Sequence, residues 1–226
     1  MKKTAPVKTR DGSHTLFNEM AGEHYHSVFG AVQESEHIFI RAGLDACRPA
    51  PEMLQVLEIG FGTGLNALLS MKWAEKHGQP IRYLGIEAFP LSQKQLEPLN
   101  YPDVLSTDKS LFRKMHDSPL VRQLSPHFAL QVLHEKFQDF SAESNTFHVV
   151  FFDAFSPDSQ PEMWTVEGFR KLYNALVPDG ILVTYSCKGD VKRALKAAGF
   201  SLEKLPGPPG KREFLRAFAV KNALNF

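Results

Sequence analysis

The stretch QVLEIGFGTGLNALLSM, residues 55–71, joins an apolar run to three alternating glycines and a second apolar segment. The pattern predicts a buried strand over residues 54–59 and a helix over residues 64–77. A glycine loop between a strand and a helix presents backbone N–H groups at the helix start, where they can face a ligand. The stretch therefore predicts a ligand-binding loop. The ligand of this loop could be a nicotinamide dinucleotide, a nucleoside triphosphate or a less charged molecule.

Strand and helix patterns alternate from residue 54 onward. Strands are expected over 54–59, 81–87, 128–134, 147–155 and 181–186, and helices over 64–77, 90–99, 161–176 and 188–198. Residues 107–125 read as a helical insertion, and 200–205 with 212–220 as a closing antiparallel pair. This order predicts an α/β fold with a mostly parallel, seven-stranded sheet covered by helices. Ligands of such sheets bind at the carboxyl ends of the strands.

The first part of the chain predicts an extension of this same domain. Asp11-Gly12 lies between short polar and apolar stretches and favours a hairpin, and residues 19–45 read as mainly helical. We therefore expect an N-terminal extension over residues 1–45 packed on a domain formed by residues 46–226. A chain of 226 residues with 43% hydrophobic and 23% charged residues is typical of one globular domain.

The composition indicates a cytoplasmic protein without membrane contact. No apolar run approaches the ~20 residues that span a bilayer, and no apolar segment follows the two lysines at the start. The two cysteines, Cys47 and Cys187, are too few for a disulfide framework and suit a reducing compartment.

The residues around the glycine loop discriminate between ligands. No Gly-Lys-Ser/Thr follows, which excludes a P-loop, and the dinucleotide pattern fits only from Gly62 to Ala67. Glu58 would face a pyrophosphate unfavourably but suits a cationic ligand. Glu87 ends the next strand, where an acid can bind ribose hydroxyls.

The pattern Glu58-x-Gly60-x-Gly62-x-Gly64 resembles the first motif of class I S-adenosylmethionine-dependent methyltransferases. The resemblance implies a Rossmann-like methyltransferase fold. It also implies that the glycines approach the methionine part of S-adenosylmethionine and that Glu87 binds its ribose. Thr63 and Asn66 are candidates for further polar contacts with the cofactor, or are simple helix-start residues.

A more specific resemblance begins at FDAFSPDSQPEMWT, residues 152–165. It is similar to a signature in the methyltransferase domain of the bifunctional tRNA 5-methylaminomethyl-2-thiouridine biosynthesis protein. The segment TYSCKGDVKRALKAAGFSLEKLPGPPGKREFLRA, residues 184–217, and EHYHSVFGAVQESEHIFIRAGL, residues 23–44, also resemble that family. The flavin-dependent oxidase half does not follow, so we expect a stand-alone form that uses no FAD.

This resemblance implies N-methylation of 5-aminomethyl(-2-thio)uridine at the tRNA wobble position, with S-adenosylmethionine as methyl donor. Asp153, at the end of a strand, is the candidate residue that orients the amine and accepts its proton. Asp153 and Ala154 are also candidates for cofactor contact, although the family has glycine at the second position. Glu135 and Asp139 remain alternatives for the adenine side.

The charge distribution favours a tRNA partner. Residues 188–226 carry nine Lys or Arg and three acids, a net +6, and the rest of the chain carries −5. Local positive charge binds phosphates, and unstacked bases are held on aromatic planes. Candidates for contact with the anticodon stem-loop are Phe155, Trp164, Tyr185, Lys192, Arg193, Lys211 and Arg212. Trp164 has core packing as its alternative.

Other readings remain open. One is a methyltransferase of a small-molecule amine, and another is a non-catalytic tRNA-binding module of the same fold. A nicotinamide enzyme is disfavoured by Glu58. His24 and His26 lack metal-ligand spacing, so no metal is expected. A separate FAD oxidase, or the upstream wobble-uridine enzymes, would be the expected protein partners.

Overall fold

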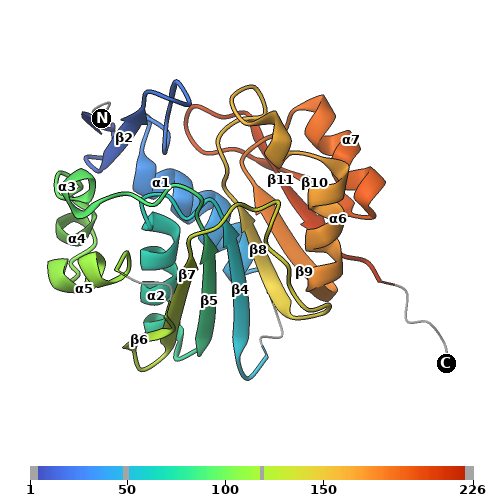
Figure 1. Cartoon of the computed structure of the whole chain (residues 1–226), viewed down its shortest axis with the longest axis horizontal. Coiled ribbons are helices and arrows are strands. Elements are labelled where there is room, and N and C mark those ends of the chain that lie inside the picture. Colours follow the sequence, from blue (N-terminus) through green and yellow to red (C-terminus); the bar gives the residue numbers. More distant parts are fainter. Residues whose placement is uncertain (1–4, 48–50, 118–119, 222–226) are drawn as a thin grey trace.

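The fold is described by a computed structural model that covers residues 5–47, 51–117 and 120–221. It contains a small antiparallel sheet and a large, mostly parallel sheet (Figure 1). The small sheet comprises β1 (Ala5–Lys8), β2 (His14–Asn18) and β3 (Glu23–His24). The large sheet comprises β4 (Leu54–Ile59), β5 (Ile81–Ile86), β6 (Arg122–Ser125), β7 (Phe128–Leu133), β8 (Phe147–Phe152), β9 (Leu176–Thr184), β10 (Ser201–Pro206) and β11 (Glu213–Phe218).

The large sheet has the strand order β10-β11-β9-β8-β4-β5-β7-β6. Its central strands β9, β8, β4, β5 and β7 pair in parallel, while β6, β10 and β11 pair antiparallel with their neighbours. The chain leaves β4 toward β5 on one side and later returns to β8 on the other. The carboxyl ends of β4 and β8 therefore flank the switch in strand order, where ligands of open α/β sheets bind.

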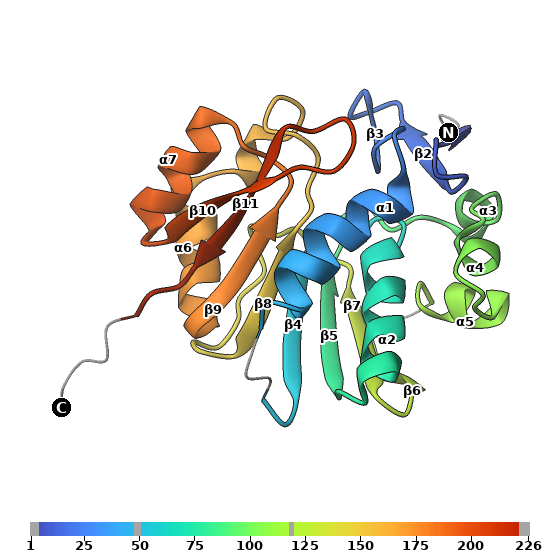
Figure 2. The same ribbon diagram turned by 180° about the vertical axis from the view of Figure 1, so that it is seen from behind.

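Helices cover both faces of the large sheet. They are α1 (Ala31–Ser35), η1 (Glu36–Leu44), α2 (Leu65–His77), α3 (Gln93–Leu96), α4 (Tyr101–Val104), α5 (Lys109–Lys114), η2 (Pro161–Met163), α6 (Val166–Ala175) and α7 (Gly189–Ala198). The π-helix η1 continues α1, and together with α2 this helix crosses one face (Figure 2), while α6 and α7 lie on the other. No helix among the described residues is long and apolar enough to cross a membrane.

The central strands explain this layering. Strands β4 (LQVLEI) and β8 (FHVVFF) are nearly continuous apolar runs, which suits parallel strands buried on both faces. Two hydrophobic clusters result, one between the sheet and η1 with α2, the other between the sheet and α6 with α7.

The sequence prediction of an α/β fold is confirmed, with one more strand than expected. Residues 122–125 lie in the predicted helical insertion but form β6, which pairs antiparallel with β7 at the sheet edge. Among the described residues of that insertion, 109–114 alone form a helix, capped by the Asp108 side chain, which accepts the Ser110 and Leu111 N–H groups. Residues 178–180, which were expected to form a turn before a strand, lie within β9, at an irregularity in its pairing with β8.

Two predicted helices are shorter than expected. The helix predicted over 161–176 is split into η2 and α6, because the Thr165 side chain caps α6 by accepting the Gly168 N–H. Within 19–45, residues before Ala31 form β3 and turns instead of helix. Propensity alone missed β3 because it exists only through pairing with β2.

The N-terminal hairpin is fastened to the rest of the domain through Asp11. Its Oδ1 accepts the N–H of Ser13 at 3.0 Å, and its Oδ2 accepts the N–H of Gln33 at 2.9 Å, in the first turn of α1. The N–H of His14 donates to Asn100 Oδ1 at 2.7 Å. The hairpin therefore sets where α1 begins.

Truncation of Phe151 tests the packing of the first hydrophobic cluster. Its ring is fully buried, 5.3 Å from Phe39 and 6.1 Å from Tyr83 between ring centres. We expect Phe151→Ala to lower the free energy of unfolding by about 3–5 kcal/mol, through lost burial and the cavity left behind. Urea denaturation measures this value. The control Met20→Ala, at an 84% exposed position, should change it by less than about 0.5 kcal/mol, and equal losses in both variants would contradict the packing.

Candidate functional site

A cavity of about 1130 Å³ opens at the carboxyl ends of β4, β5 and β8. Its wall comes from the segment between β2 and α1, the glycine loop, the ends of β5 and β7, the loop after β8, and the loop before β11. Segments from both ends of the chain therefore close over the strand ends. The volume suits a nucleoside-sized ligand together with a second molecule.

Two glycines bring the backbone loop close to its neighbours. Gly60 has a φ of +89°, and a Cβ there would lie 2.6 Å from the backbone oxygen of Asp153. Gly62 has a φ of +51°, and a Cβ there would lie 3.0 Å from the Tyr25 ring. Any side chain at either position would be strained, so the glycines form a narrow backbone cradle on the cavity wall. Gly64, with a φ of +73°, lies below this cradle and does not line the cavity.

Glu87 is held at the end of β5 by the loop itself. Its Oε2 accepts the N–H of Gly62 at 2.8 Å, and its Oε1 accepts the N–H of Phe89 at 2.8 Å. The carboxylate also lines the cavity. Each oxygen keeps a further lone pair, so Glu87 can accept hydrogen bonds from ligand hydroxyls.

Asp153 is a half-buried acid on the cavity wall. Its backbone N–H donates to Ile59 O at 2.9 Å, and its Oδ2 accepts the Asn66 amide at 2.8 Å. Burial raises the pKa of Asp153 to about 7, with a further rise from the charge of Glu34, while the Asn66 hydrogen bond and the Lys211 charge lower it. A carboxyl with such a pKa can exchange a proton near neutral pH.

The structure corrects the expected place of Glu58. Its side chain is 1% exposed and does not line the cavity. Its Oε1 accepts the Asn66 amide and its Oε2 the Tyr83 hydroxyl, both at 2.8 Å. Burial and the charge of Asp153 raise its pKa well above the ordinary value. Alternation along β4 points Glu58 toward α2 on one face of the sheet, not beyond the strand end.

Thr63 and Asn66 also lie inside the protein, not on the cavity wall. Thr63 Oγ1 is 2.7 Å from His26 Nε2, so the hydroxyl ties the loop to the N-terminal segment. The Asn66 amide joins the carboxylates of Glu58 and Asp153. Both residues support the site from below.

The aromatic candidates fall into two groups. Phe155 and Tyr185 line the cavity, where Phe155 packs edge-on against Tyr25 and the Tyr185 hydroxyl donates to Ala154 O at 2.9 Å. Trp164 does not reach the cavity. Its ring is 6% exposed and its Nε1 donates to Phe155 O at 2.9 Å, so the core alternative describes its position.

Of the four basic candidates, Lys211 alone lines the cavity. Its Nζ is 3.3 Å from Glu34 Oε1 and 4.6 Å from the centre of the Tyr185 ring. Arg212 is exposed beside it, while Lys192 and Arg193 lie on α7, with Arg193 paired to Asp190. The sequence therefore grouped residues that the fold places on different surfaces.

Other cavity residues were not singled out from the sequence. Glu23 accepts the Ser156 N–H at 3.1 Å and the Ser159 hydroxyl at 2.6 Å, which fastens the N-terminal segment to the loop after β8. Tyr25 and Glu34 line the cavity from the same segment. The sequence signal for these residues was the resemblance of residues 23–44 to the methyltransferase family, which did not indicate a role for any one of them. Glu135 and Asp139 both lie on the cavity wall, so both remain alternatives.

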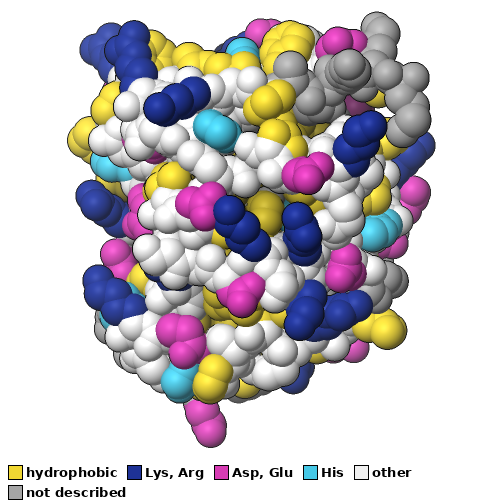
Figure 3. Space-filling model, turned by 90° about the vertical axis from the view of Figure 1, so that its left-hand side faces the viewer, with side chains coloured by type: hydrophobic (Ala, Val, Ile, Leu, Met, Phe, Trp, Pro, Cys, Tyr) yellow, Lys and Arg dark blue, Asp and Glu magenta, His cyan; other side chains and the backbone are white. Residues whose placement is uncertain are grey.

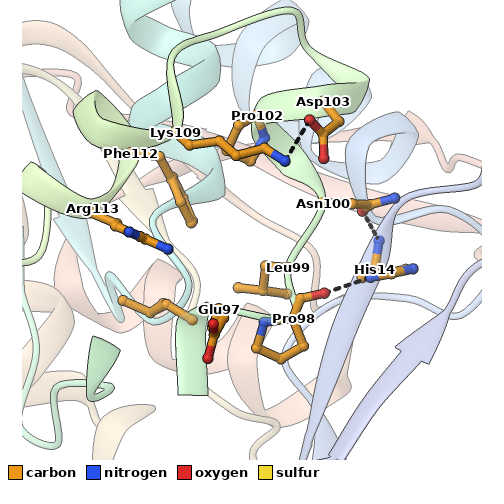
Figure 4. Close-up of a pocket in the computed structure, with 11 residues that line it drawn as sticks. His14, Glu97, Pro98, Leu99, Asn100, Pro102, Asp103, Lys109, Phe112 and Arg113 are labelled. Atoms are coloured by element: carbon orange, nitrogen blue, oxygen red, sulfur yellow. Dashed lines mark hydrogen bonds and ion pairs between the residues drawn. The ribbon is translucent and has the colours of Figure 1, made fainter. Parts of the chain in front are cut away.

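A smaller cavity of about 270 Å³ lies between β2 and α3–α5 (Figure 4). Two of its polar side chains have partners: His14 Nδ1 is 2.7 Å from Pro98 O, and Lys109 is 2.9 Å from Asp103. The face over these helices carries basic and acidic side chains interspersed (Figure 3). We take the large cavity as the candidate site because the glycine loop and the ends of β5 and β8 line it.

No cluster of three or more His, Cys, Asp or Glu side chains within residues 5–47, 51–117 and 120–221 is arranged to hold a metal ion.

Comparison with known proteins identifies relatives. Residues 121–220 match a family model described as S-adenosyl-L-methionine-dependent methyltransferase. The chain is 30% identical over 220 residues to the tRNA 5-methylaminomethyl-2-thiouridine biosynthesis bifunctional protein MnmC of Burkholderia multivorans, covering 89% of this chain and 33% of that protein. It is 32% identical over 218 residues to the MnmC of Paracidovorax citrulli, covering 90% and 34%. The chain thus spans about a third of the length of the curated relatives it matches.

A solved structure supports the fold. The crystal structure of MNMC2 from Aquifex aeolicus matches with a TM-score of 0.79 and 24% identity, covering 96% of this chain and 70% of that one. The predicted class I methyltransferase fold is therefore confirmed.

The raised pKa of Asp153 predicts a pH-dependent cost to stability. An unfolded Asp has a pKa of about 3.9, and burial raises that of the folded residue to about 7. Between these values the folded protein binds more protons than the unfolded chain, so stability falls as pH rises through this window and is level above it. We expect Asp153→Asn to remove this loss.

Urea unfolding at pH 4.5, 6 and 8 measures the effect. Asp153→Asn should gain stability relative to the unsubstituted protein as pH rises, and the two should differ least at pH 4.5. The control Asp103→Asn, at a 61% exposed ion pair, should follow the parent curve. Parallel curves for Asp153→Asn and the parent would mean that Asp153 titrates as an ordinary acid.

Proposed function

Because this chain is a homologue of the bifunctional MnmC proteins along about 90% of its length, we propose that it is a tRNA methyltransferase. It transfers a methyl group from S-adenosylmethionine to the amine of 5-aminomethyl(-2-thio)uridine at the wobble position, giving the 5-methylaminomethyl form. The observation that carries this proposal is the half-buried Asp153 carboxyl, with a raised pKa, on the cavity wall next to the glycine cradle. That arrangement puts a proton acceptor beside a nucleoside-binding loop.

The residues present fit the methyl donor. S-adenosylmethionine supplies a methyl group on a positively charged sulfur. The cradle at Gly60 and Gly62 leaves room for close approach to the backbone, and Glu87 is placed to accept the ribose hydroxyls. Glu135 or Asp139 would contact the adenine side. Negative charge on this wall suits a cationic ligand.

The inner residues take a supporting role in this proposal. Asn66 and Thr63 hold the loop and Asp153 in place through the hydrogen bonds described above. Glu58 keeps the Asn66 amide oriented from the other side. They shape the cradle without touching the cofactor.

The reaction asks the protein to position an amine and remove a proton. An alkylamine is mostly protonated at neutral pH, and the resulting ammonium group has no lone pair for attack on a methyl group. Asp153 accepts this proton, because its raised pKa lets the carboxylate bind a proton near neutral pH. The same carboxylate orients the nitrogen, and positioning supplies much of the rate enhancement in such transfers.

The target base must leave the anticodon loop to enter the cavity. Phe155 and Tyr185 line the entry and offer ring surfaces to an unstacked base. Arg212, Lys192 and Arg193 lie outside the cavity and would meet phosphates of the anticodon stem-loop, Arg193 by exchanging its exposed ion pair with Asp190. This division separates base recognition from backbone binding.

The proposed reaction needs an aminomethyl precursor. The curated relatives are named bifunctional, and this chain matches about a third of their length. We propose that a separate FAD oxidase or the upstream wobble-uridine enzymes supply the substrate. The reaction takes place in the cytoplasm with tRNA and needs neither a metal nor FAD.

The first test is the reaction itself. Purified protein is incubated with labelled S-adenosylmethionine and tRNA from a strain blocked before the final methylation, and the nucleosides are separated. We expect label in 5-methylaminomethyl(-2-thio)uridine and a rate that rises with pH to a plateau above about 7, because burial raises the pKa of Asp153 to about 7. Asp153→Asn should lower kcat by about 100-fold or more.

The exposed Asp103→Asn serves as the control and should retain the parent rate. Label in no tRNA nucleoside, with S-adenosylmethionine still bound, would refute the wobble-uridine reaction.

Charge reversal on the exposed surface tests the tRNA contact. We expect Arg212→Glu and the double change Lys192→Glu/Arg193→Glu to weaken tRNA binding, and each lost phosphate contact to reduce the slope of log Kd against log salt by about 1. Binding of S-adenosylmethionine should stay unchanged, because none of these side chains lines the cavity. Filter binding at several salt concentrations measures both. Unchanged tRNA affinity would place the docking surface elsewhere.

A further inference from the structure

Glu34 carries a buried oxygen that no hydrogen bond satisfies. The residue lies on α1, is 8% exposed and lines the large cavity. Its Oε2 accepts the N–H of Ser27 at 2.8 Å, which fixes the carboxylate. Its Oε1 is buried and accepts no hydrogen bond, and its partner is the Lys211 ammonium in an ion pair. Burying an acceptor in this way is costly, so the oxygen is suited to a donor that the substrate brings.

The surroundings of this oxygen are selective for a cation. The Lys211 ammonium lies 3.3 Å from Oε1 and 4.6 Å from the centre of the Tyr185 ring. A carboxylate beside an aromatic face is a combination that attracts ammonium groups. The cavity therefore contains a place where an ammonium group is already stabilised, between Glu34 and Tyr185.

This place is close to the acid of the proposed reaction. The charge of Glu34 raises the pKa of Asp153, and the charge of Lys211 lowers it. Glu34, Lys211 and Asp153 also line the same cavity. Two of the carboxylates that line this cavity, those of Glu34 and Asp153, thus interact with the charge of Lys211. A second cation can be accepted there without leaving the region positively charged.

We propose that Glu34 recognises the amine of the substrate in its ammonium form, through a hydrogen bond to Oε1, with the Tyr185 ring as the second contact. Asp153 then takes the proton from the ammonium group that Glu34 has oriented. The inference deepens the proposed function and rests on it for the identity of the amine. Under this inference, the N-terminal segment distinguishes substrates that carry the aminomethyl group from those that do not.

A purely structural role makes a different prediction. If Glu34 served only to hold Lys211, removing either partner of the pair would have the same effect. Under the proposal, Glu34→Gln loses the charge that binds the substrate, while Lys211→Met removes a competing cation and leaves the binding carboxylate. Glu36→Gln, on the adjoining η1 and away from the cavity wall, is the matched control.

The experiment measures binding of two nucleosides by NMR titration, with S-adenosylhomocysteine present. The probes are 5-aminomethyluridine and 5-methyluridine, which differ by the amine. We expect the parent protein and Glu36→Gln to prefer the amine. Glu34→Gln should lose roughly tenfold of that preference, with unchanged affinity for 5-methyluridine and S-adenosylhomocysteine, which shows that the variant is folded. Lys211→Met should keep the preference or increase it.

Several results would overturn the proposal. They are a parent protein without preference for the amine, an unchanged preference in Glu34→Gln, and an equal loss in Lys211→Met. The proposed tRNA reaction is judged separately by the labelling assay. Amine preference that depends on Glu34 in a protein that does not methylate tRNA would support the amine subsite and reject the tRNA substrate.

Discussion

Two carboxylates joined by one amide, Glu58 fully buried and Asp153 half-buried, hold the site together. Asn66 Nδ2 donates to Glu58 and to Asp153 at 2.8 Å each, and the Tyr83 hydroxyl donates to Glu58 from the other side. Burial raises the pKa of both acids; the charge of Asp153 raises that of Glu58 further, and the charge of Glu34 raises that of Asp153 further. Only a firmly packed frame can keep them together. The hydrophobic clusters on the two faces of the sheet supply that frame.

The glycine loop depends on the same arrangement. Gly60 passes so close to the backbone of Asp153 that a side chain has no room, and the start of α2 carries Asn66 directly beneath it. The loop, the helix and the acid are therefore one unit, in which the position of each fixes the other two. A site that needs an accurately placed proton acceptor benefits from this coupling, because small displacements reduce the rate of transfer strongly.

The large sheet supplies a cradle, and the N-terminal segment supplies much of the remaining wall. Glu23 binds the loop after β8, and His26 contacts Thr63 in the glycine loop. Glu34 forms an ion pair with Lys211, which lies near the other end of the chain. The sheet and cradle belong to a fold that serves many chemistries. Under the proposals above, the added segment recognises the amine of the substrate, and the sheet and cradle bind the cofactor.

The sequence by itself determined the alternation of strands and helices, the glycine cradle, and the acids Glu87 and Asp153 at strand ends, because strand ends and turns leave local patterns. It placed Glu58 at the ligand and Trp164 among the base-stacking candidates, since spacing does not tell which way a side chain points. Tertiary structure decided those directions, the edge strand β6, and the pairing of Glu34 with Lys211. Contacts between residues so far apart in the chain depend on how the layers pack, which no local pattern records.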